Sequence, residues 1–309
     1  MGLALSTSWN AYRHNKGIAL IREIKELGFN EVELSFNLTG EIVSDIHKAV
    51  SRKEVRVTAL HNYCPIPGGF SRSAGLPDCL SLAAADENER LNAVKYSQRT
   101  IEAAARLNAK AVILHCGRVE IFDFTRKLMS LYEAGTLAAA EGKKLKAQIQ
   151  KERLGSIKPH FAAALKSLDV LARCAAKLKV KLGIENRFYF REIPSFEEIG
   201  DILKYFKDAQ IYYWHDTGHA QLWQNLGFIK HEDYLKRYSG RLLGIHLHDI
   251  EGAKDHLAPL KGNLDFGMLK KYIKPDTLLT IEAHHPATAE DIVSAKKYLE
   301  GLFFKNGPN

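Results

Sequence analysis

The 309-residue sequence predicts a parallel (β/α)8 barrel, the TIM-barrel fold, on three observations. Seven apolar runs each carry, at or near the carboxyl end, a side chain able to bind a metal. These side chains are Glu33, His61, His115, Glu185, Asp216, His246 and Glu282. The runs recur at the spacing of one strand plus one helix, and amphipathic helical patterns lie between them. Since a parallel barrel gathers the carboxyl ends of its strands at one face, the pattern predicts the fold and its active site together.

The spacing of the candidate strands supports eight units. Leu3–Ser6 supplies the first strand, ahead of the seven runs. Four intervals between successive metal-binding candidates are 28, 31, 30 and 36 residues long. A βα unit of a 250-residue barrel averages about 30 residues, so each of these intervals holds one unit. Two intervals are longer, 54 residues before His115 and 70 residues after it, and we expect insertions there.

Four segments between the apolar runs show the 3.6-residue periodicity of amphipathic helices. Gly28 follows the first segment directly, as glycine often does just past a helix end. Asp86 and Glu89 open the second segment as the acid pair of a capping arrangement. The apolar stripes run over residues 18–27, 91–107, 165–178 and 292–302.

The two long intervals predict long insertions after strands 3 and 4. Residues 62–85 are rich in Pro, Gly and Ser, whereas residues 118–155 look helical and have a strongly basic second half. Both follow strand ends, so they rise from the catalytic face, where they would form either a lid or a surface hairpin or dimer contact. No linker interrupts the chain, and we expect residues 1–309 to form one domain.

The composition is that of an ordinary globular protein, with 46% hydrophobic and 26% charged residues. No apolar run is long enough for a membrane span, and the N-terminus lacks an export signal. The four cysteines lack metal-site spacing, and reduced thiols in a cytoplasmic protein are the simplest interpretation. Cys64 and Cys116 follow candidate site strands, where a packing role is favoured over metal ligation.

The net charge of +8 favours an anionic partner only weakly, because most lysines fall on polar faces of predicted helices. Several basic residues fall in the βα loops and predict a basic mouth: Arg13, Arg72, Arg118, Arg187, Lys254 and Lys261. Such a mouth suits a small anionic sugar, and nucleic acid is a less favoured partner. No Walker loop or GxGxxG motif is present, so we expect no nucleotide cofactor. A homo-oligomer is compatible with the sequence, which carries no signal of oligomeric state.

Four of the strand-end residues form a candidate metal site. Glu185, Asp216, His246 and Glu282 come from four consecutive strands, so their side chains would converge on the barrel axis. Singly, each has an ordinary alternative as a helix cap or a core histidine. Jointly, several buried acids without a cation would be costly. Three carboxylates and one imidazole suit manganese, zinc, cobalt or magnesium, and the ligand types do not choose among them.

Several short motifs resemble the xylose-isomerase-like TIM-barrel superfamily over essentially the whole chain. They are Glu185-Asn186, His215-Asp216-Thr217-Gly218-His219, His246-Leu247-His248-Asp249 and Asp255-His256-Leu257-Ala258-Pro259. This superfamily includes sugar and sugar-phosphate isomerases and epimerases, inosose dehydratases and the endonuclease IV (AP endonuclease family 2) group of abasic-site nucleases.

The resemblance implies a divalent-metal-dependent isomerase or epimerase that acts on a small sugar, polyol or sugar phosphate through an enediolate. In such epimerases, residues matching Glu185, Asp216, His246 and Glu282 hold the metal, and the two glutamates exchange a proton at carbon. We expect His219, Arg187, Trp9 and Glu33 to contact the substrate. For Arg187, an ion pair with a site glutamate is an equal alternative.

The alternative function is that of an endonuclease IV-like zinc phosphodiesterase. In that family, His61, His115, His219 and His256 match ligands of a three-zinc cluster, in which Glu185 would bridge two metals. The third zinc also takes an aspartate at the position of Lys254, and here Asp255 is displaced by one residue. A further alternative, from a different class, is a non-catalytic sugar-binding barrel.

The other histidines divide into two groups. His248, Asp249, His284 and His285 follow site strands, and we expect them to orient ligands. We expect exposed positions for His14, His47, His160 and His231.

Overall fold

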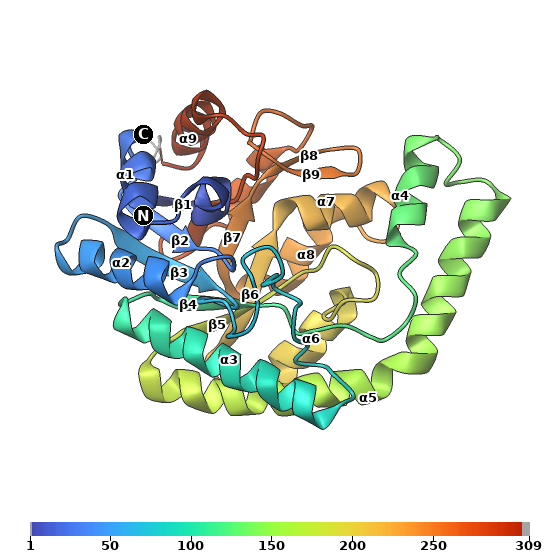
Figure 1. The fold of residues 1–309 in the computed structure, drawn as a ribbon. Helices are drawn as coiled ribbons and strands as arrows, with labels where there is room; N and C mark the ends of the chain where they lie inside the picture. Colours follow the sequence, from blue (N-terminus) through green and yellow to red (C-terminus); the bar gives the residue numbers. More distant parts are fainter. Residues whose placement is uncertain (1, 305–309) are drawn as a thin grey trace.

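The computed structural model describes residues 2–304, which form a single-domain α/β barrel (Figure 1). Eight parallel strands close in the order β1-β10-β7-β6-β5-β4-β3-β2, so the predicted eight-stranded barrel is confirmed. Every strand anticipated from the sequence is present: β1 Leu3–Ser6, β2 Glu31–Leu34, β3 Arg56–His61, β4 Ala111–Leu114, β5 Lys181–Glu185, β6 Ile211–Asp216, β7 Leu242–Leu247 and β10 Leu278–Ile281. Strands β8 (Asp249–Glu251) and β9 (Lys254–Leu257) form a separate antiparallel ribbon after β7.

The helices surround the barrel, and the predicted apolar stripes lie on them. The α-helices are α1 Gly17–Glu26, α2 Gly40–Ser51, α3 Glu87–Arg106, α4 Thr125–Glu133, α5 Ala140–Leu178, α6 Phe196–Tyr205, α7 Thr217–Asn225, α8 His231–Tyr238 and α9 Ala289–Phe303. The 3-10 helices are η1 Thr7–Trp9, η2 Ala11–Arg13, η3 Ser239–Arg241 and η4 Phe266–Tyr272. As the sequence suggests, Asp86 caps α3 by accepting from the backbone N–H of Glu89 at 2.7 Å. No helix in residues 2–304 is long and apolar enough to cross a membrane.

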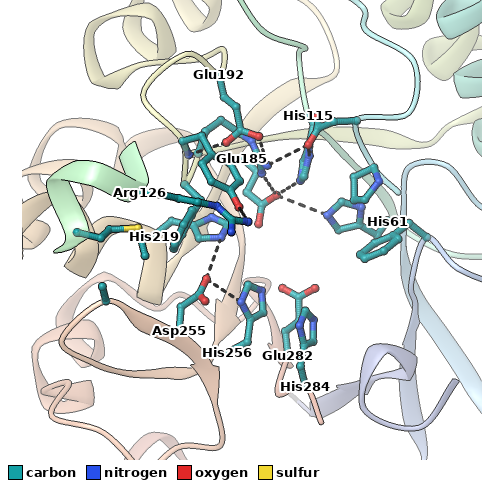
Figure 2. Close-up of a pocket in the computed structure, with 18 of the residues that line it drawn as sticks. His61, His115, Arg126, Glu185, Glu192, His219, Asp255, His256, Glu282 and His284 are labelled. Carbon is teal, nitrogen blue, oxygen red and sulfur yellow. Dashed lines mark hydrogen bonds and ion pairs between the residues drawn. The ribbon is translucent and has the colours of Figure 1, made fainter. Parts of the chain in front are cut away.

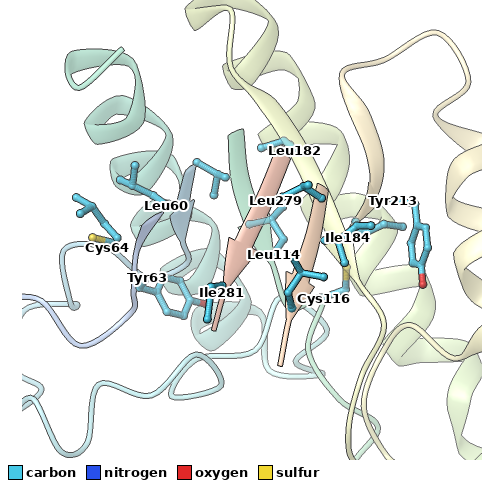
Figure 3. Close-up of a cluster of buried hydrophobic side chains, with 14 of the residues drawn as sticks. Leu60, Tyr63, Cys64, Leu114, Cys116, Leu182, Ile184, Tyr213, Leu279 and Ile281 are labelled. Atoms are coloured by element: carbon cyan, nitrogen blue, oxygen red, sulfur yellow. The ribbon is translucent and has the colours of Figure 1, made fainter. Parts of the chain in front are cut away.

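The two faces of the strands have separate cores. Val112 and Leu114 of β4 belong to the large core between strands and helices, whereas Ala111 and Ile113 belong to a smaller cluster inside the barrel. Figure 3 shows the outer layer, where strand residues pack around the buried thiols of Cys64 and Cys116. Burial raises the pKa of the Cys116 thiol to about 12, which suits the predicted packing role.

Glycines make room for the largest side chain inside the barrel. A Cβ at Gly244 of β7 would lie 2.4 Å from Cζ3 of the fully buried Trp214 ring, and one at Gly183 of β5 would lie 3.0 Å from its Cε3. Both strands therefore need glycine beside Trp214. The ring fills the barrel just below the strand ends, with its centroid 5.2 Å from that of the His246 ring.

Both predicted insertions are present, with different character. Residues 62–86 contain turns but no helix or strand. The second insertion holds α4 and the first half of α5, a 39-residue helix that continues without a break into the predicted stripe over residues 165–178. The sequence suggested two separate segments, but one helix joins them. Figure 1 shows α4 and this half of α5 standing out beside the barrel as an arm.

A buried ion pair fastens the arm to the barrel. Arg153 of α5 donates to both carboxylate oxygens of Glu198, at 2.5 and 2.8 Å, and to the carbonyl oxygens of Phe190 and Glu192. Glu198 is itself part of the capping box that begins α6. One guanidinium therefore positions α5, the β5–α6 loop and α6 relative to one another.

We predict that Arg153→Met lowers the free energy of unfolding by about 3–5 kcal/mol, because it leaves the Glu198 carboxylate buried and unpaired. The control is Arg173→Met on the same helix, which breaks an exposed pair with Asp169 and should cost less than about 1 kcal/mol. Urea denaturation measures both variants. Equal losses would show that Arg153 is not the fastening residue.

Candidate metal centre

The predicted strand-end side chains converge at the mouth of the barrel. The residues that end β3, β5 and β6 lie on the same strand faces as the inner cluster, because side chains alternate with a period of two. They border a cavity of about 570 Å³ (Figure 2). Its lining includes His61, His115, Glu185, His219, His256 and Glu282.

Four buried ligands meet below this cavity. One donor atom each from Glu185, Asp216, His246 and Glu282 lies within 4.8 Å of the other three. His246 Nδ1 is 2.9 Å from Glu185 Oε1, 2.9 Å from Glu282 Oε2 and 3.7 Å from Asp216 Oδ2. The structure thus brings together the four residues that the sequence nominated as a metal site.

The tautomer of His246 shows that this set fits a cation. Nε2 lies 3.0 Å from Glu33 Oε2 and, as an N–H, donates to it, so the Nδ1 lone pair of the neutral ring would face three carboxylates. Acceptors that converge in this way need a positive charge between them. Burial favours the neutral ring, but Glu282 and Glu33 outweigh it and raise the pKa of His246 well above its usual range. The donor set therefore suits a divalent metal.

Glu33 and Trp9 do not lie where the substrate prediction requires. Neither is among the described residues that line the cavity. Glu33 is fully buried behind the His246 ring, where its carboxylate fixes the tautomer of a ligand. Trp9 donates from its indole N–H to the carbonyl of Ala287 at 2.9 Å. Both positions indicate orienting or packing roles rather than contact with substrate.

Two neighbouring side chains, those of His248 and Asn186, hold Asp216 in place. His248 Nε2 lies 2.9 Å from each Asp216 oxygen, and its Nδ1 accepts from the backbone N–H of His256. Both ring nitrogens of His248 are therefore engaged, and an orienting role for this residue stays a prediction. Asn186 bonds to the backbone N–H and C=O of Asp216 at 2.8 and 2.9 Å. A Cβ at Gly218 would lie 2.2 Å from His248 Cε1, so this arrangement requires glycine there.

A second group of ligand types surrounds the other oxygen of Glu185. His115 Nε2 lies 2.9 Å and His61 Nε2 3.5 Å from Glu185 Oε2. Nδ1 of His61 faces the carbonyl of Asn62 and Nδ1 of His115 faces the carboxylate of Asp78, so Nε2 of each ring is directed toward Glu185. These three residues meet the same geometric requirement as the first set. Glu185 could bridge two cations through its two oxygens.

Arg187 already supplies a cation to this second group. Its buried guanidinium lies 2.8 Å from Glu185 Oε2, 3.2 Å from Glu192 and 3.8 Å from Asp78. The ion pair that was an alternative for Arg187 is thus the arrangement found. A second divalent metal at Glu185 Oε2 would have to tolerate this fixed positive charge.

His219 and His256 form a further group of possible ligands with Asp216 and His248, whose donor atoms lie within 4.8 Å of one another. His219 donates from Nδ1 to the Asn186 carbonyl, and its Nε2 is 3.9 Å from Asp255 Oδ2. The His256 ring lies between those of His248 and His284, with centroids 4.2 and 3.9 Å away, and its Nδ1 is 2.8 Å from Asp255 Oδ2. Burial opposes its charge, but Asp255 raises the pKa of His256 to about 9. Without a metal, His256 is therefore the ion-pair partner of Asp255.

Two sequence expectations at the mouth are wrong. The mouth is not basic: six carboxylates line the described cavity against two guanidiniums, those of Arg126 and Arg187. The nominated loop arginines are engaged elsewhere, since Arg13 pairs with Glu23 and Arg72 donates to backbone carbonyls. His160 and His231 are buried rather than exposed, because each bonds to partners distant in sequence.

Sequence reasoning missed four charged lining residues, one of which is Glu133 of α4. Asp78 comes from the first insertion, Arg126 from α4 of the second, and Glu192 from the β5–α6 loop. None ends a strand, so strand periodicity could not identify them. Their one common signal is position in a βα connection.

The chain belongs to the family described as the xylose isomerase-like TIM barrel, whose model matches residues 21–301. An uncharacterized protein of Methanocaldococcus jannaschii is 25% identical over 267 residues, covering 84% of this chain and 83% of that protein.

Among solved structures, 3-keto-D-glucoside 4-epimerase from E. coli is 17% identical with a TM-score of 0.68, covering 97% and 99% of the two chains. D-allulose 3-epimerase from Methylomonas sp., in complex with D-allulose, is 13% identical with a TM-score of 0.67, covering 97% and 95%. At this identity the two likenesses show the shared fold.

We predict that Glu33→Gln weakens divalent-metal binding about 10–100-fold, because the neutral amide polarises the His246 ring less than the carboxylate does. Competition titration of zinc or cobalt against a chromophoric chelator measures the change. Glu31→Gln is the matched control, since Glu31 lies on the same strand and pairs with Arg56 at the opposite end. Unchanged affinity in Glu33→Gln would contradict the orienting role.

Proposed function

We propose that this protein is a divalent-metal-dependent isomerase or epimerase that acts on a small sugar or polyol. One observation carries the proposal: two buried glutamates, Glu185 and Glu282, face each other across the cavity and share one metal-ligand set (Figure 2). Sugar epimerases among the structural neighbours support this choice.

The chain's own residues would divide the chemistry as follows. A divalent cation held by Glu185, Asp216, His246 and Glu282 would stabilise negative charge on the substrate oxygens. Burial opposes ionisation of Glu282, but His246 lowers its pKa well below the usual range. Glu185 has a lowered pKa as well, through His115, His246 and His61. Two ionised carboxylates on facing sides can take a proton from carbon on one face and return it on the other.

The pocket residues would position the sugar. His219 borders the cavity with Nδ1 fixed by the Asn186 carbonyl, which leaves Nε2 to accept from a hydroxyl group. Arg187 is paired through its two terminal nitrogens with Glu185 and Glu192, so it would act mainly by holding Glu185 in place. Phe188 and Tyr189 add aromatic surface to the lining, as in many sugar sites.

We predict that Glu282→Gln lowers turnover about 10²–10⁴-fold, because the amide can neither accept the proton nor hold the metal with a full charge. The assay screens neutral ketoses, aldoses and cyclic polyols with manganese-, cobalt-, magnesium- or zinc-loaded protein, and proton exchange is followed by NMR in D₂O. Chelation should abolish exchange, and Glu31→Gln should retain it. Full exchange in Glu282→Gln would refute the proposal.

The group formed by His61, His115 and Glu185 favours a second candidate, a zinc phosphodiesterase of the abasic-site nuclease type. Two cations bridged by Glu185 would suit a phosphodiester. Arg187 opposes it by occupying the oxygen that a second metal needs. The acidic lining also opposes a DNA backbone.

Metal content distinguishes the two candidates. We expect about one divalent ion per chain in protein purified without chelator, and a second ion in Arg187→Met, because that substitution frees Glu185 Oε2. Plasma mass spectrometry measures both. Two or three zincs in the unmodified protein, with cleavage of abasic-site duplex DNA that His115→Ala abolishes, would favour the nuclease. Metal and sugar binding without turnover would leave a non-catalytic barrel.

A further inference from the structure

A second cavity of about 740 Å³ lies beside the candidate active site, between α5 and the barrel. Its lining is aromatic and includes Phe161, Phe190, Phe196, Trp223 and Phe228. The rings of Phe190, Trp223 and Phe228 pack at centroid distances of 5.3 to 5.7 Å, so this wall is rigid. The volume falls in the range of small-molecule sites, about 300–1,000 Å³. We call this cavity the outer groove.

The outer groove adjoins the candidate active site. Arg187, Tyr189 and Glu192 line both cavities. The Trp223 indole N–H donates to the Arg187 carbonyl at 2.6 Å, which ties the aromatic wall to the residue that contacts Glu185. A bound molecule that reaches from the candidate metal-binding residues past Tyr189 would enter the outer groove.

Helix α5 supplies the opposite wall. Leu154, Ile157 and Phe161 recur at helical spacing on this helix, and all three line the groove. Ile157 and Phe161 are half-buried against the core, whereas Leu154 is 76% exposed, although an apolar side chain gains free energy by burial. An apolar ring bound in the groove would cover Leu154.

Charge indicates that the occupant is neutral. The lining of the first cavity has six carboxylates and two guanidiniums. One divalent cation would not neutralise this excess of negative charge, so a phosphate group would be repelled. In the outer groove, Arg153 is neutralised by Glu198, and Glu197 pairs with Arg237. Neither cavity offers an unpaired cluster of cations to an anionic substrate.

We propose that the outer groove is a subsite for an uncharged ring, aromatic or sugar, glycosidically joined to the sugar that reacts at the metal. The inference rests on the proposed function and specifies its substrate class as a neutral glycoside rather than a free sugar or a sugar phosphate. Aromatic walls stack on the flat faces of both kinds of ring.

The test compares ligands that differ only in the ring beyond the glycosidic bond. Calorimetric titration of the metal-loaded protein uses phenyl, glucosyl and methyl β-glycosides of D-glucose, D-galactose and D-xylose. For at least one sugar we expect the phenyl or the glucosyl compound to bind about tenfold or more tightly than the methyl one. Whichever is preferred identifies the ring as aromatic or sugar.

Two variants locate the effect. Leu154→Asp changes an exposed side chain, so folding is unaffected, and it should remove most of the preference; Phe228→Ala should do the same from the opposite wall. Leu91→Asp on α3 is the matched control, since Leu91 is 50% exposed and lies outside the groove lining.

The outcomes separate this inference from the proposed function. Equal binding of phenyl, glucosyl and methyl glycosides, or a preference that survives both groove variants, would overturn the subsite even if free sugars undergo metal-dependent proton exchange. A groove-dependent preference without exchange on any sugar or glycoside would support the subsite and refute the isomerase.

Discussion

Mutual repulsion among buried carboxylates is the constraint around which this barrel mouth is arranged. Glu185, Asp216 and Glu282 place their oxygens within a few ångströms of one another in a region shielded from water. Such an arrangement is unfavourable without a cation. Neighbouring groups also orient the carboxylates and the imidazole, since Glu33 contacts Nε2 of His246 and Asn186 fixes the backbone of Asp216.

The negative charge on the second oxygen of Glu185 is compensated differently. There, the guanidinium of Arg187 supplies the positive charge, so the cation is part of the protein. A side-chain cation cannot be exchanged and offers no open position to a substrate oxygen. The distinction between a fixed and an exchangeable cation separates carbon-centred proton transfer at one metal from hydrolysis at two.

Much of the fold and the ligand set followed from the sequence, because both depend on short-range periodicity. Side chains alternate between the two faces of a strand, so the pattern of apolar residues in β5 predicts that Glu185 points into the barrel. The parallel topology then places the end of the next strand beside it. Contacts set by the tertiary structure were not accessible in that way. His231 is buried and contacts His215, and Arg13 forms an ion pair with Glu23. Asp78 and Glu192 reach the site through irregular loops, whose path no periodicity describes.

Helix α5 combines the arm and a barrel helix in one continuous element, and Pro159 lies where the two parts meet. Proline contributes no amide hydrogen, so the backbone carbonyl one turn earlier loses its helical partner and the helix bends most readily there. Phe161 lies just beyond this point, whereas Leu154 lies before it. Arg153 lies six residues before Pro159 and is held by Glu198 and by two carbonyls of the β5–α6 loop, so the helix is fixed to the barrel on the arm side of the proline. The same loop carries Glu192 beside Arg187, so the width of the outer groove is linked to the residues around Glu185.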